Sequence, residues 1–244
     1  MKTCIIVPVY NHHEAIGRVV MALRQFNVPC MLINDGSSVQ CTAELRRLAE
    51  QEKHWVILHE RTENGGKGAA VITGFKLALA QGFTHAIQID ADGQHCLADI
   101  GLFLSASAAD PYKLILGAPR YDGSISKKRL YGREFTNLWI WINTLSFDIK
   151  DGMCGFRCYP LAAVDKILQS TALGQRMDFD IDIAVRLHWD GVGIVNIGTD
   201  VKYPIDGVSH FRMLQDNLLI SKKHAQLFFG MLWRLPLLLL RRWR

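Results

Sequence analysis

Several signals of common protein classes are missing from this sequence, and each absence narrows what the protein does. No internal repeat or low-complexity tract is present, which excludes repeat architectures and disordered or fibrous chains. The six cysteines include no pair with the two-residue spacing common in zinc sites, so we expect free, mostly buried thiols in a reducing compartment. The apolar stretch within residues 1–8 is too short for a signal peptide.

Two frequent nucleotide-binding signatures are also missing. The glycine-rich segment 64–70 lacks the spacing of a P-loop. No Gly-x-Gly-x-x-Gly follows the first apolar run, which argues against a nicotinamide-dependent enzyme.

Positive charge is scarce outside the C-terminal end. The net charge is +5, from 28 basic and 23 acidic residues. Six of the basic residues and one acid lie in 213–244, which leaves 22 of each in 1–212. The neutral body offers no broad basic surface, so we expect no nucleic-acid partner.

Short apolar runs bounded by turn residues alternate with stretches of helical spacing. We expect strands at Cys4–Val9, Met31–Ile33, Trp55–Leu58, Ala86–Ile89, Leu114–Leu116, Gly155–Tyr159 and Val192–Ile197. We expect helices at Glu14–Phe26, Thr42–Glu52, Lys67–Ala80, Leu97–Ala106, Arg129–Phe147 and Phe179–Trp189, a loop at Pro204–Arg212, and a helix from Leu214. This alternation predicts an α/β fold with a mostly parallel, doubly buried sheet over residues 1–212, followed by a helical tail over 213–244.

The acidic pair Asp90 and Asp92 follows the fourth apolar run, with Gln94 two residues later. On an extended backbone the two carboxylates would point the same way and repel unless a cation lay between them. Oxygen ligands suit Mg²⁺ or Mn²⁺, which often bridge carboxylates to phosphates. We therefore expect a metal site here, while a solvated Asp-Gly turn is the alternative.

Two further segments suit a nucleotide. Asp35 ends the second run and is placed to accept hydrogen bonds from a ribose or base, although it could equally form an Asx turn or a helix cap. The segment 64–70 precedes a helix, so its glycines would let the backbone approach a phosphate while Lys67 adds charge. A loop that simply needs positive φ angles is the alternative.

Basic and acidic residues in the second half supply other candidates. Arg120, Arg129 and Arg133 surround a Gly/Ser-rich stretch and could clamp a diphosphate. Asp178, Asp180 and Asp182 alternate at a helix start, where they could cap the helix or include a general base. His95 and His210 lie in polar, glycine-bearing contexts and are secondary ligand candidates.

Together these segments resemble family 2 glycosyltransferases with the GT-A fold, and most closely the polyprenyl-phosphate mannosyl- or glucosyltransferase branch. The resemblance covers roughly Thr3 to Arg212. It is carried by Val7-Pro8-Val9-Tyr10-Asn11, Asn34-Asp35-Gly36-Ser37, Asn64-Gly65-Gly66-Lys67-Gly68, Asp90-Ala91-Asp92-Gly93-Gln94-His95 and Gly155-Phe156-Arg157.

The resemblance implies a set of roles. It implies that Asp90, Asp92 and Gln94 hold the metal. It implies that the nucleotide-sugar donor is bound by Pro8, Tyr10, Asn11, Glu14, Asp35, Lys67, Gly68, Asp90, Ala91, Asp92 and His210, the last in a loop that closes over the donor. Arg120 and Arg133 are implied as contacts to the donor phosphates, and the family inverts at the anomeric carbon.

The tail differs from full membrane anchors. Its two apolar runs, Leu227–Trp233 and Leu235–Leu240, are interrupted by Arg234 and Pro236, and neither reaches the ~20 residues of a spanning helix. Leu, Phe and Trp interleaved with Lys and Arg favour a helix lying on the cytoplasmic face of the membrane. Packing on the body or on a second subunit is the alternative, and a homodimer stays open.

The combined reading is an inverting, metal-dependent glycosyltransferase that uses a UDP- or GDP-sugar and a lipid or lipid-phosphate acceptor. A lipid phosphate is already ionised, whereas a hydroxyl acceptor would need a base, for which Asp180 is the first choice and Asp178 the second. A sugar nucleotidyltransferase is disfavoured because residues 10–14 lack its glycine-rich basic loop. A non-catalytic nucleotide-sugar-binding scaffold is the remaining alternative.

Overall fold

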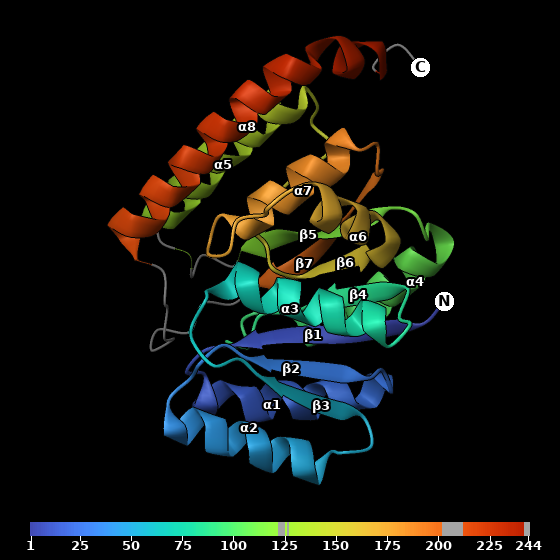
Figure 1. Ribbon diagram of the computed structural model, residues 1–244, viewed down its shortest axis with the longest axis vertical. Coiled ribbons are helices and arrows are strands. Elements are labelled where there is room, and N and C mark those ends of the chain that lie inside the picture. The colour runs from blue at the N-terminus through green and yellow to red at the C-terminus, as the bar shows by residue number, and fades with distance from the viewer. Residues whose placement is uncertain (122–124, 126, 202–211, 242–244) are drawn as a thin grey trace.

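A computed structural model describes residues 1–121, 125, 127–201 and 212–241, which form one seven-stranded sheet flanked by helices (Figure 1). The strands are β1 (Thr3–Val9), β2 (Cys30–Asn34), β3 (Val56–Glu60), β4 (His85–Gln88), β5 (Leu114–Tyr121), β6 (Arg157–Pro160) and β7 (Ile194–Val201). The helices are α1 (His13–Leu23), α2 (Val39–Gln51), α3 (Lys67–Ala80), α4 (Ile100–Ala109), α5 (Lys127–Thr144), α6 (Leu161–Ser170), α7 (Phe179–Trp189) and α8 (Met213–Arg241), with 3₁₀ turns η1 (Arg24–Phe26) and η2 (Leu97–Asp99).

The sheet is mostly parallel, as the alternation of apolar runs and helical stretches predicts. Its order is β3-β2-β1-β4-β6-β5-β7, and β6 pairs antiparallel with both β4 and β5. The other pairs, including β5 with β7, are parallel. Burial on both faces holds for β1 and β2 but not for β3, which lies at the edge of the sheet and exposes Ile57 and Glu60.

Two apolar layers cover the two faces of the sheet. Alternate residues of β1 enter different cores: Cys4 and Ile6 pack with α3, α6 and α7, whereas Ile5 and Val7 pack with α1, α2 and α4. Figure 1 shows these helices on opposite sides of the sheet. This period of two follows from the pleat of a strand and explains why continuous apolar runs mark the central strands.

Some element boundaries differ from the sequence expectation. Helix α6, Leu161–Ser170, was not predicted; it follows β6 directly, and its first residue is preceded by Pro160, which makes no side-chain cap. Helix α5 ends at Thr144 rather than Phe147 because Leu145 has φ +52, a left-handed conformation that ends an α-helix. The predicted loop at Pro204–Arg212 lies almost wholly outside the described residues.

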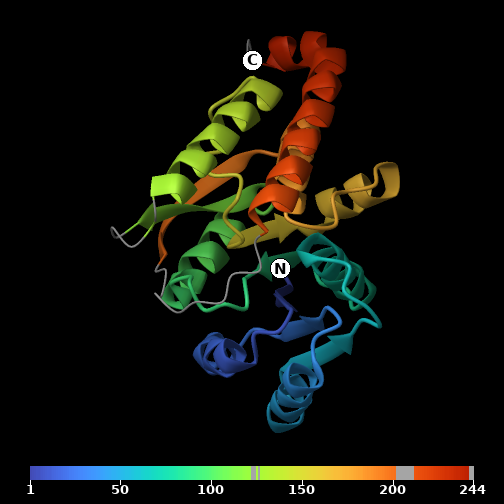
Figure 2. The same cartoon turned by 90° about the vertical axis from the view of Figure 1, so that its left-hand side faces the viewer.

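The C-terminal helix α8 lies against the body beside α5, and the two views agree on this (Figures 1 and 2). Ile220, Leu227 and Met231 of α8 join the apolar core. Arg241 Nη1 donates to the carbonyl of Trp189 at 2.6 Å, which fixes the far end of α8 to α7. Within the described part of the chain, no helix combines the length and apolar character required to cross a bilayer.

Candidate active site

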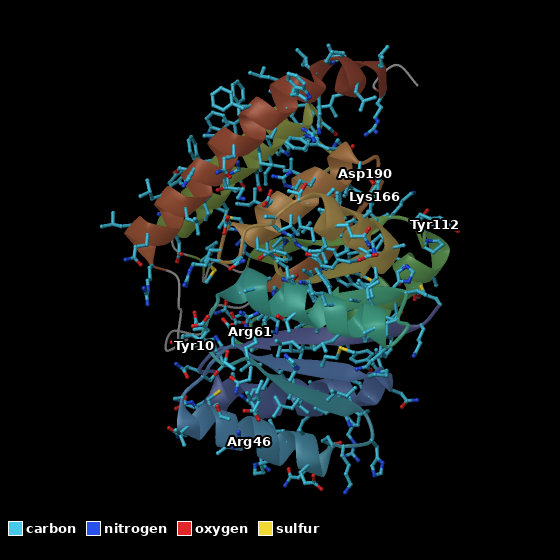
Figure 3. The ribbon with its side chains drawn as sticks, in the orientation of Figure 1. Tyr10, Arg46, Arg61, Tyr112, Lys166 and Asp190 are labelled. Carbon is cyan, nitrogen blue, oxygen red and sulfur yellow. The ribbon has the colours of Figure 1, made fainter. Side chains whose placement is uncertain are left out.

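Parallel strands bring the polar segments of the sequence to one edge of the sheet. The carboxyl ends of β1, β2 and β4 share that edge because these strands are parallel neighbours. Tyr10 and Arg61, which are labelled in Figure 3, both lie at this edge. This is the edge at which open α/β sheets bind their ligands.

Asp90 and Asp92 line one small pocket together with Gln94, His95, Tyr121, Arg133 and Gly155. The backbone brings them together through a turn, not through the extended alternation expected from the sequence: residues 91 and 92 turn, and Gly93 has φ +71. Asp92 Oδ1 accepts a hydrogen bond from the Gln94 amide at 3.0 Å, so an Asx turn shapes the acidic pair. The turn considered as the alternative is therefore present, and a metal site at the same residues stays a prediction.

Lys67 places a positive charge between two carboxylates. Its Nζ lies 2.7 Å from Asp90 Oδ1 and 2.8 Å from Asp180 Oδ2. His95 Nε2 lies 3.4 Å from Asp90 Oδ2. Burial alone would raise the pKa of Asp90, but Lys67 and His95 outweigh it and hold that pKa far below its usual range. Asp90 is thus an ionised carboxylate paired with the Lys67 ammonium.

Asp92 sits in a contrasting electrostatic environment. Burial, and then the charge of Asp90, raise the pKa of Asp92 above its ordinary value. The two carboxylates share one pocket, and carboxylate oxygens are ligands that a divalent cation prefers.

Asp180 belongs to a buried polar network that is linked to Asp90 through Lys67. Its Oδ1 accepts from Gln88 Nε2 at 3.0 Å, and Gln88 Oε1 accepts from the Tyr159 hydroxyl at 3.0 Å. Arg157, which is fully buried, donates through Nη1 to the Asp180 carbonyl at 2.5 Å. Its other groups donate to the carbonyls of Cys154 and Gly152, each at 2.7 Å, so Arg157 ties the start of β6 to α7.

Asp35 is turned toward the glycine-rich loop. Its carboxylate accepts from the amides of Gly65 at 3.0 Å and Gly66 at 2.8 Å, and it pairs with Arg61 at 2.8 Å. The side chain is almost completely buried. Asp35 therefore holds the loop that precedes α3, and contact with a nucleotide stays a prediction.

The loop after β1 is fixed to the loop after β2. Asn11 has φ +55, its amide donates to Ser37 Oγ at 3.1 Å, and its Oδ1 accepts from the Ser38 amide at 2.7 Å. Pro8 is buried within β1, Tyr10 is partly buried beyond its end, and Glu14 is exposed on the first turn of α1. These residues lie at or near the carboxyl end of β1, and their contacts with a nucleotide stay predictions.

The two predicted phosphate-binding arginines have different locations. Arg133 lines the pocket and makes a paired contact with Asp151, with Nε–Oδ2 at 3.0 Å and Nη2–Oδ1 at 2.7 Å. Arg120 does not reach the pocket, because Pro119 and Tyr121 line it and the residue between them on β5 points to the other face. Arg120 pairs with the exposed Asp200 of β7 at 2.8 Å, and its contact with the donor phosphates stays a prediction.

The remaining candidates are distributed as follows. Asp178 faces away from the pocket and pairs with Lys223 of α8. Gly68 is needed for packing, because a Cβ there would lie 2.5 Å from Phe179 Cβ, and the next amide, that of Ala69, already donates to the Gln175 carbonyl. Ala91 is buried beside the acidic pair. His210 lies outside the described residues.

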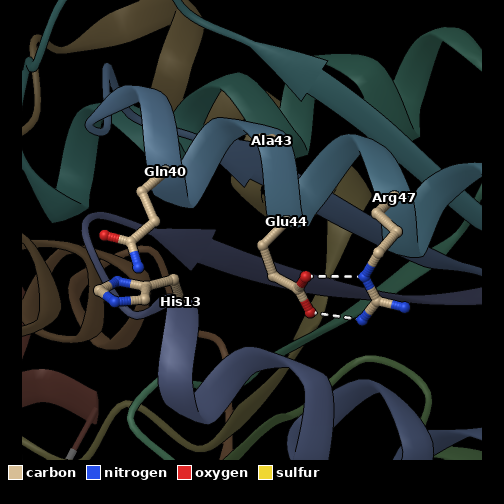
Figure 4. Close-up of a pocket in the computed structure, with 5 residues that line it drawn as sticks. All are labelled: His13, Gln40, Ala43, Glu44 and Arg47. Atoms are coloured by element: carbon tan, nitrogen blue, oxygen red, sulfur yellow. Dashed lines mark hydrogen bonds and ion pairs between the residues drawn. The ribbon is translucent and has the colours of Figure 1, made fainter.

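A second depression lies between α1 and α2 and is lined by His13, Gln40, Ala43, Glu44 and Arg47 (Figure 4). Glu44 and Arg47 already form an ion pair at 2.6 Å across one turn of α2. None of the acidic site residues lines it, so we assign the chemistry to the Asp90 pocket.

Sequence reasoning missed Gly155, Gln88 and Arg157 as site residues. A Cβ on Gly155 would lie 2.3 Å from Asp90 Oδ2, so only glycine leaves room for that carboxylate. Gln88 lies within a strand and Arg157 begins one, where a lone polar residue gives no signal of a buried network. The Gly155-Phe156-Arg157 triplet was part of the family resemblance, but no function at the site was predicted for its residues.

The fold and the acidic pocket define a class of sugar-transferring enzymes, and sequence similarity agrees. The chain belongs to glycosyl transferase family 2, whose model matches residues 4–167, and it is a glycosyltransferase. It is similar to polyprenol monophosphomannose synthase of Mycolicibacterium smegmatis, with 28% identity over 204 residues covering 80% of this chain and 76% of that protein. It is also similar to undecaprenyl-phosphate mannosyltransferase of Micrococcus luteus, with 28% identity over 211 residues covering 81% and 82%.

A solved structure confirms the GT-A fold expected from the sequence. The chain is similar to glucosyl-3-phosphoglycerate synthase from Mycobacterium tuberculosis, crystallised with Mn²⁺, uridine-diphosphate-glucose and glycerol 3-phosphate. The TM-score is 0.64 at 14% identity, over 93% of this chain and 79% of that chain. At that identity the likeness concerns the fold alone.

Proposed function

We propose that this chain is an inverting, metal-dependent glycosyltransferase that moves a sugar from a UDP- or GDP-sugar to a polyprenyl phosphate at a membrane surface. The observation that carries the proposal is the pocket at the carboxyl edge of the sheet, where Asp90 and Asp92 lie together and Lys67 stands 2.7 Å from Asp90. The relatives named for polyprenol and undecaprenyl-phosphate mannosyl transfer support the acceptor class.

The residues present fit a divalent cation. The pocket offers oxygen atoms of Asp90, Asp92 and Gln94, the ligand type that Mg²⁺ and Mn²⁺ prefer. Among the described residues no three His, Cys, Asp or Glu side chains cluster as a metal cage, so a bound cation would complete its shell with donor phosphates and water. Such a cation would act as a Lewis acid that neutralises the departing diphosphate.

Side chains of the protein would stabilise the donor phosphates and position the ionised groups of the site. Arg133 lines the same pocket and would add positive charge beside the donor phosphates, with Asp151 fixing its guanidinium plane. A phosphate acceptor is already ionised, so no side chain has to remove a proton. Asp180 would then serve to hold Lys67 against Asp90, and it would act as a base only toward a hydroxyl acceptor.

The exposed faces of α5 and α8 suit a lipid surface. Large apolar side chains are exposed on both helices: Tyr131, Phe135 and Leu138 on α5, and Leu214, Leu218, Phe229, Leu232, Trp233, Leu237 and Leu240 on α8. The two helices stand side by side (Figure 2). The basic end of the sequence, with Arg241, Arg242 and Arg244, favours an anionic leaflet. We infer peripheral binding at the cytoplasmic face of the membrane, close to a lipid acceptor.

A transfer screen tests the proposal. Purified full-length chain would be mixed with radiolabelled UDP- and GDP-sugars, Mn²⁺ or Mg²⁺, and vesicles containing undecaprenyl phosphate, and the lipid phase would be counted. We expect labelled lipid with one donor, none after chelation by EDTA, and an Asp92→Asn variant reduced by at least about 100-fold. Metal-dependent nucleotide binding without transfer or donor hydrolysis would instead identify a non-catalytic binding protein.

A further inference from the structure

Lys223 of α8 reaches into the body and lies between two carboxylates at the start of α7. Its Nζ is 2.8 Å from Asp182 Oδ2 and 3.5 Å from Asp178 Oδ2. All three residues are buried, and Asp182 is fully so. Because a buried charge is costly unless its partners are fixed around it, this contact is a built part of the interface between α8 and α7.

The carboxylates that hold Lys223 are themselves fixed. Asp182 also accepts from Arg186 Nε at 2.6 Å and from the Gly174 amide at 2.9 Å. Gly174 lies against Asp178, since a Cβ there would be 2.3 Å from Asp178 Oδ2. Lys223 therefore anchors the segment 174–182 as well as the first turn of α7.

The same first turn carries Asp180, which faces the active site. Asp180 pairs with Lys67 at 2.8 Å, and Lys67 pairs with Asp90 at 2.7 Å. The segment before α7 also accepts the Ala69 amide at the carbonyl of Gln175, which links it to the start of α3. A displacement of this turn would thus move Asp180 and Lys67 away from Asp90.

We propose that Lys223 is a positioning residue of the active site, although it lies on the C-terminal helix. It holds Asp178 and Asp182, and through the turn between them it sets Asp180 and Lys67 against Asp90. The inference rests on the proposed function. Helix α8 would then have two roles. Its buried face, which carries Lys223, would contribute to turnover, and its exposed face, which carries Leu218 and Phe229, would face the lipid.

Kinetics of three variants test this role. Lys223→Met, Lys223→Arg and the control Lys76→Met, an exposed lysine of α3 away from the lipid-facing helices, would be compared in the vesicle transfer assay. We expect Lys223→Met to lower kcat by at least about tenfold while the KM for the nucleotide sugar changes less than about twofold. Lys223→Arg should recover most of the lost kcat, and Lys76→Met should match the wild type.

A second variant separates positioning from folding. The double variant Lys223→Met, Asp182→Asn removes one positive and one negative charge and leaves Asp178 and Arg186 charged. Its kcat would be expressed per chain that binds Mn²⁺ and nucleoside diphosphate. We expect it to fold and to keep a low kcat, because the link between α8 and α7 is still missing. Wild-type kcat in either Met variant would overturn the proposal.

Other outcomes are equally decisive. Failure of both Met variants to fold would overturn the proposal, since Lys223 would then serve the fold as a whole. A wild-type chain that transfers sugar to no acceptor would refute the proposed function itself. An active wild type with an equally active Lys223→Met variant would refute only the positioning role.

Discussion

Lys67 is the positive charge that Asp90 and Asp180 share at the site, since its ammonium forms an ion pair with both carboxylates. Although burial disfavours its charge, the two carboxylates raise the pKa of Lys67 above its ordinary value. Lys67 was expected to meet a phosphate, and the glycines around it were expected to form a cradle. In the structure its ammonium lies 2.7 Å from Asp90 Oδ1, and its contact with a phosphate stays a prediction.

Replacement of Lys67 by Met leaves two buried carboxylates without their shared cation. We expect the free energy of unfolding to fall by about 3 kcal/mol, since removal of one partner from a buried ion pair leaves uncompensated charge. Urea unfolding would measure it, with Lys76→Met, an exposed lysine of the same helix, as the control. Equal midpoints for the two variants would contradict the role assigned to Lys67.

Gly155 makes room for the Asp90 carboxylate. A Cβ at this position would lie within 2.6 Å of three Asp90 atoms, and φ at Gly155 is not in the left-handed region, so alanine changes the space and not the backbone. We expect Gly155→Ala to displace Asp90 from Lys67 and to lower kcat/KM for the nucleotide sugar by at least about tenfold.

The control for this substitution is Gly101→Ala on α4, where an added Cβ meets nothing within 4 Å. Transfer kinetics of the two variants would be compared under the same conditions. A Gly155→Ala enzyme as active as Gly101→Ala would show that the Asp90 position is not critical.

His224 ties the stability of the α8 interface to pH. Burial lowers the pKa of His224 to about 4 from 6.5, and the imidazole contacts Asn143 of α5. Between about pH 6.5 and about pH 4, His224 is therefore protonated in the unfolded chain and neutral in the folded chain. Stability should fall as pH drops through this window, by up to about 3 kcal/mol.

Urea unfolding at pH 7 and pH 5 would test this, with His224→Gln beside the wild type. We expect the wild type to lose more stability than the variant between the two pH values. An identical loss in both would remove His224 as the cause.

At the scale of elements, the sequence pattern located the central strands and most helices because their apolar periodicity is strong. It missed α6, since this helix follows a strand without a turn or a polar cap, and Pro160 stands where a capping residue would signal its start. It also could not tell which lysine of α8 faces inward. Lys222 and Lys223 are adjacent in a basic, apolar tail, and only packing against α7 distinguishes them.

Helix α8 packs on the body, which was one of the alternatives considered for the tail, and binding to a membrane stays a prediction. It packs on α5 and α7 through one face, and it exposes a broad apolar face that the described chain leaves uncovered. Trp233 is 87% exposed, and Phe229, one turn earlier, is 70% exposed. Packing on the body and binding to a membrane are therefore compatible.

Sedimentation with anionic vesicles tests the exposed face of α8. We expect the double variant Phe229→Ser, Trp233→Ser to lose at least about tenfold in vesicle affinity, because two large apolar side chains no longer enter the interface. The control is Tyr112→Ser, an equally exposed aromatic at the other side of the molecule (Figure 3). Unchanged binding of the double variant would exclude this face as the membrane contact.

At the scale of the whole molecule, the sheet joins three distant parts of the chain at one pocket. The loop after β4 supplies Asp90, α3 supplies Lys67, and α7 supplies Asp180, and these residues are far apart in sequence. The sequence predicted the acidic pair and its edge of the sheet from the order of strands. It could not predict that Asp180 and Asp90 share one lysine, because that contact depends on the packing of α7 on α3.

The central claim is that the acidic pair seats a divalent cation that binds the donor diphosphate. Electron paramagnetic resonance of free Mn²⁺, titrated with protein and UDP or GDP, measures this directly. Asp92→Asn is the informative variant because Asp90 also holds Lys67. Its control is Asp110→Asn, a half-buried aspartate that pairs with Lys113 and does not line the pocket. The account predicts one Mn²⁺ bound per chain with nucleotide, and an affinity at least about tenfold weaker in Asp92→Asn alone. Equal Mn²⁺ affinity in the two variants, or no binding by the wild type, would contradict it.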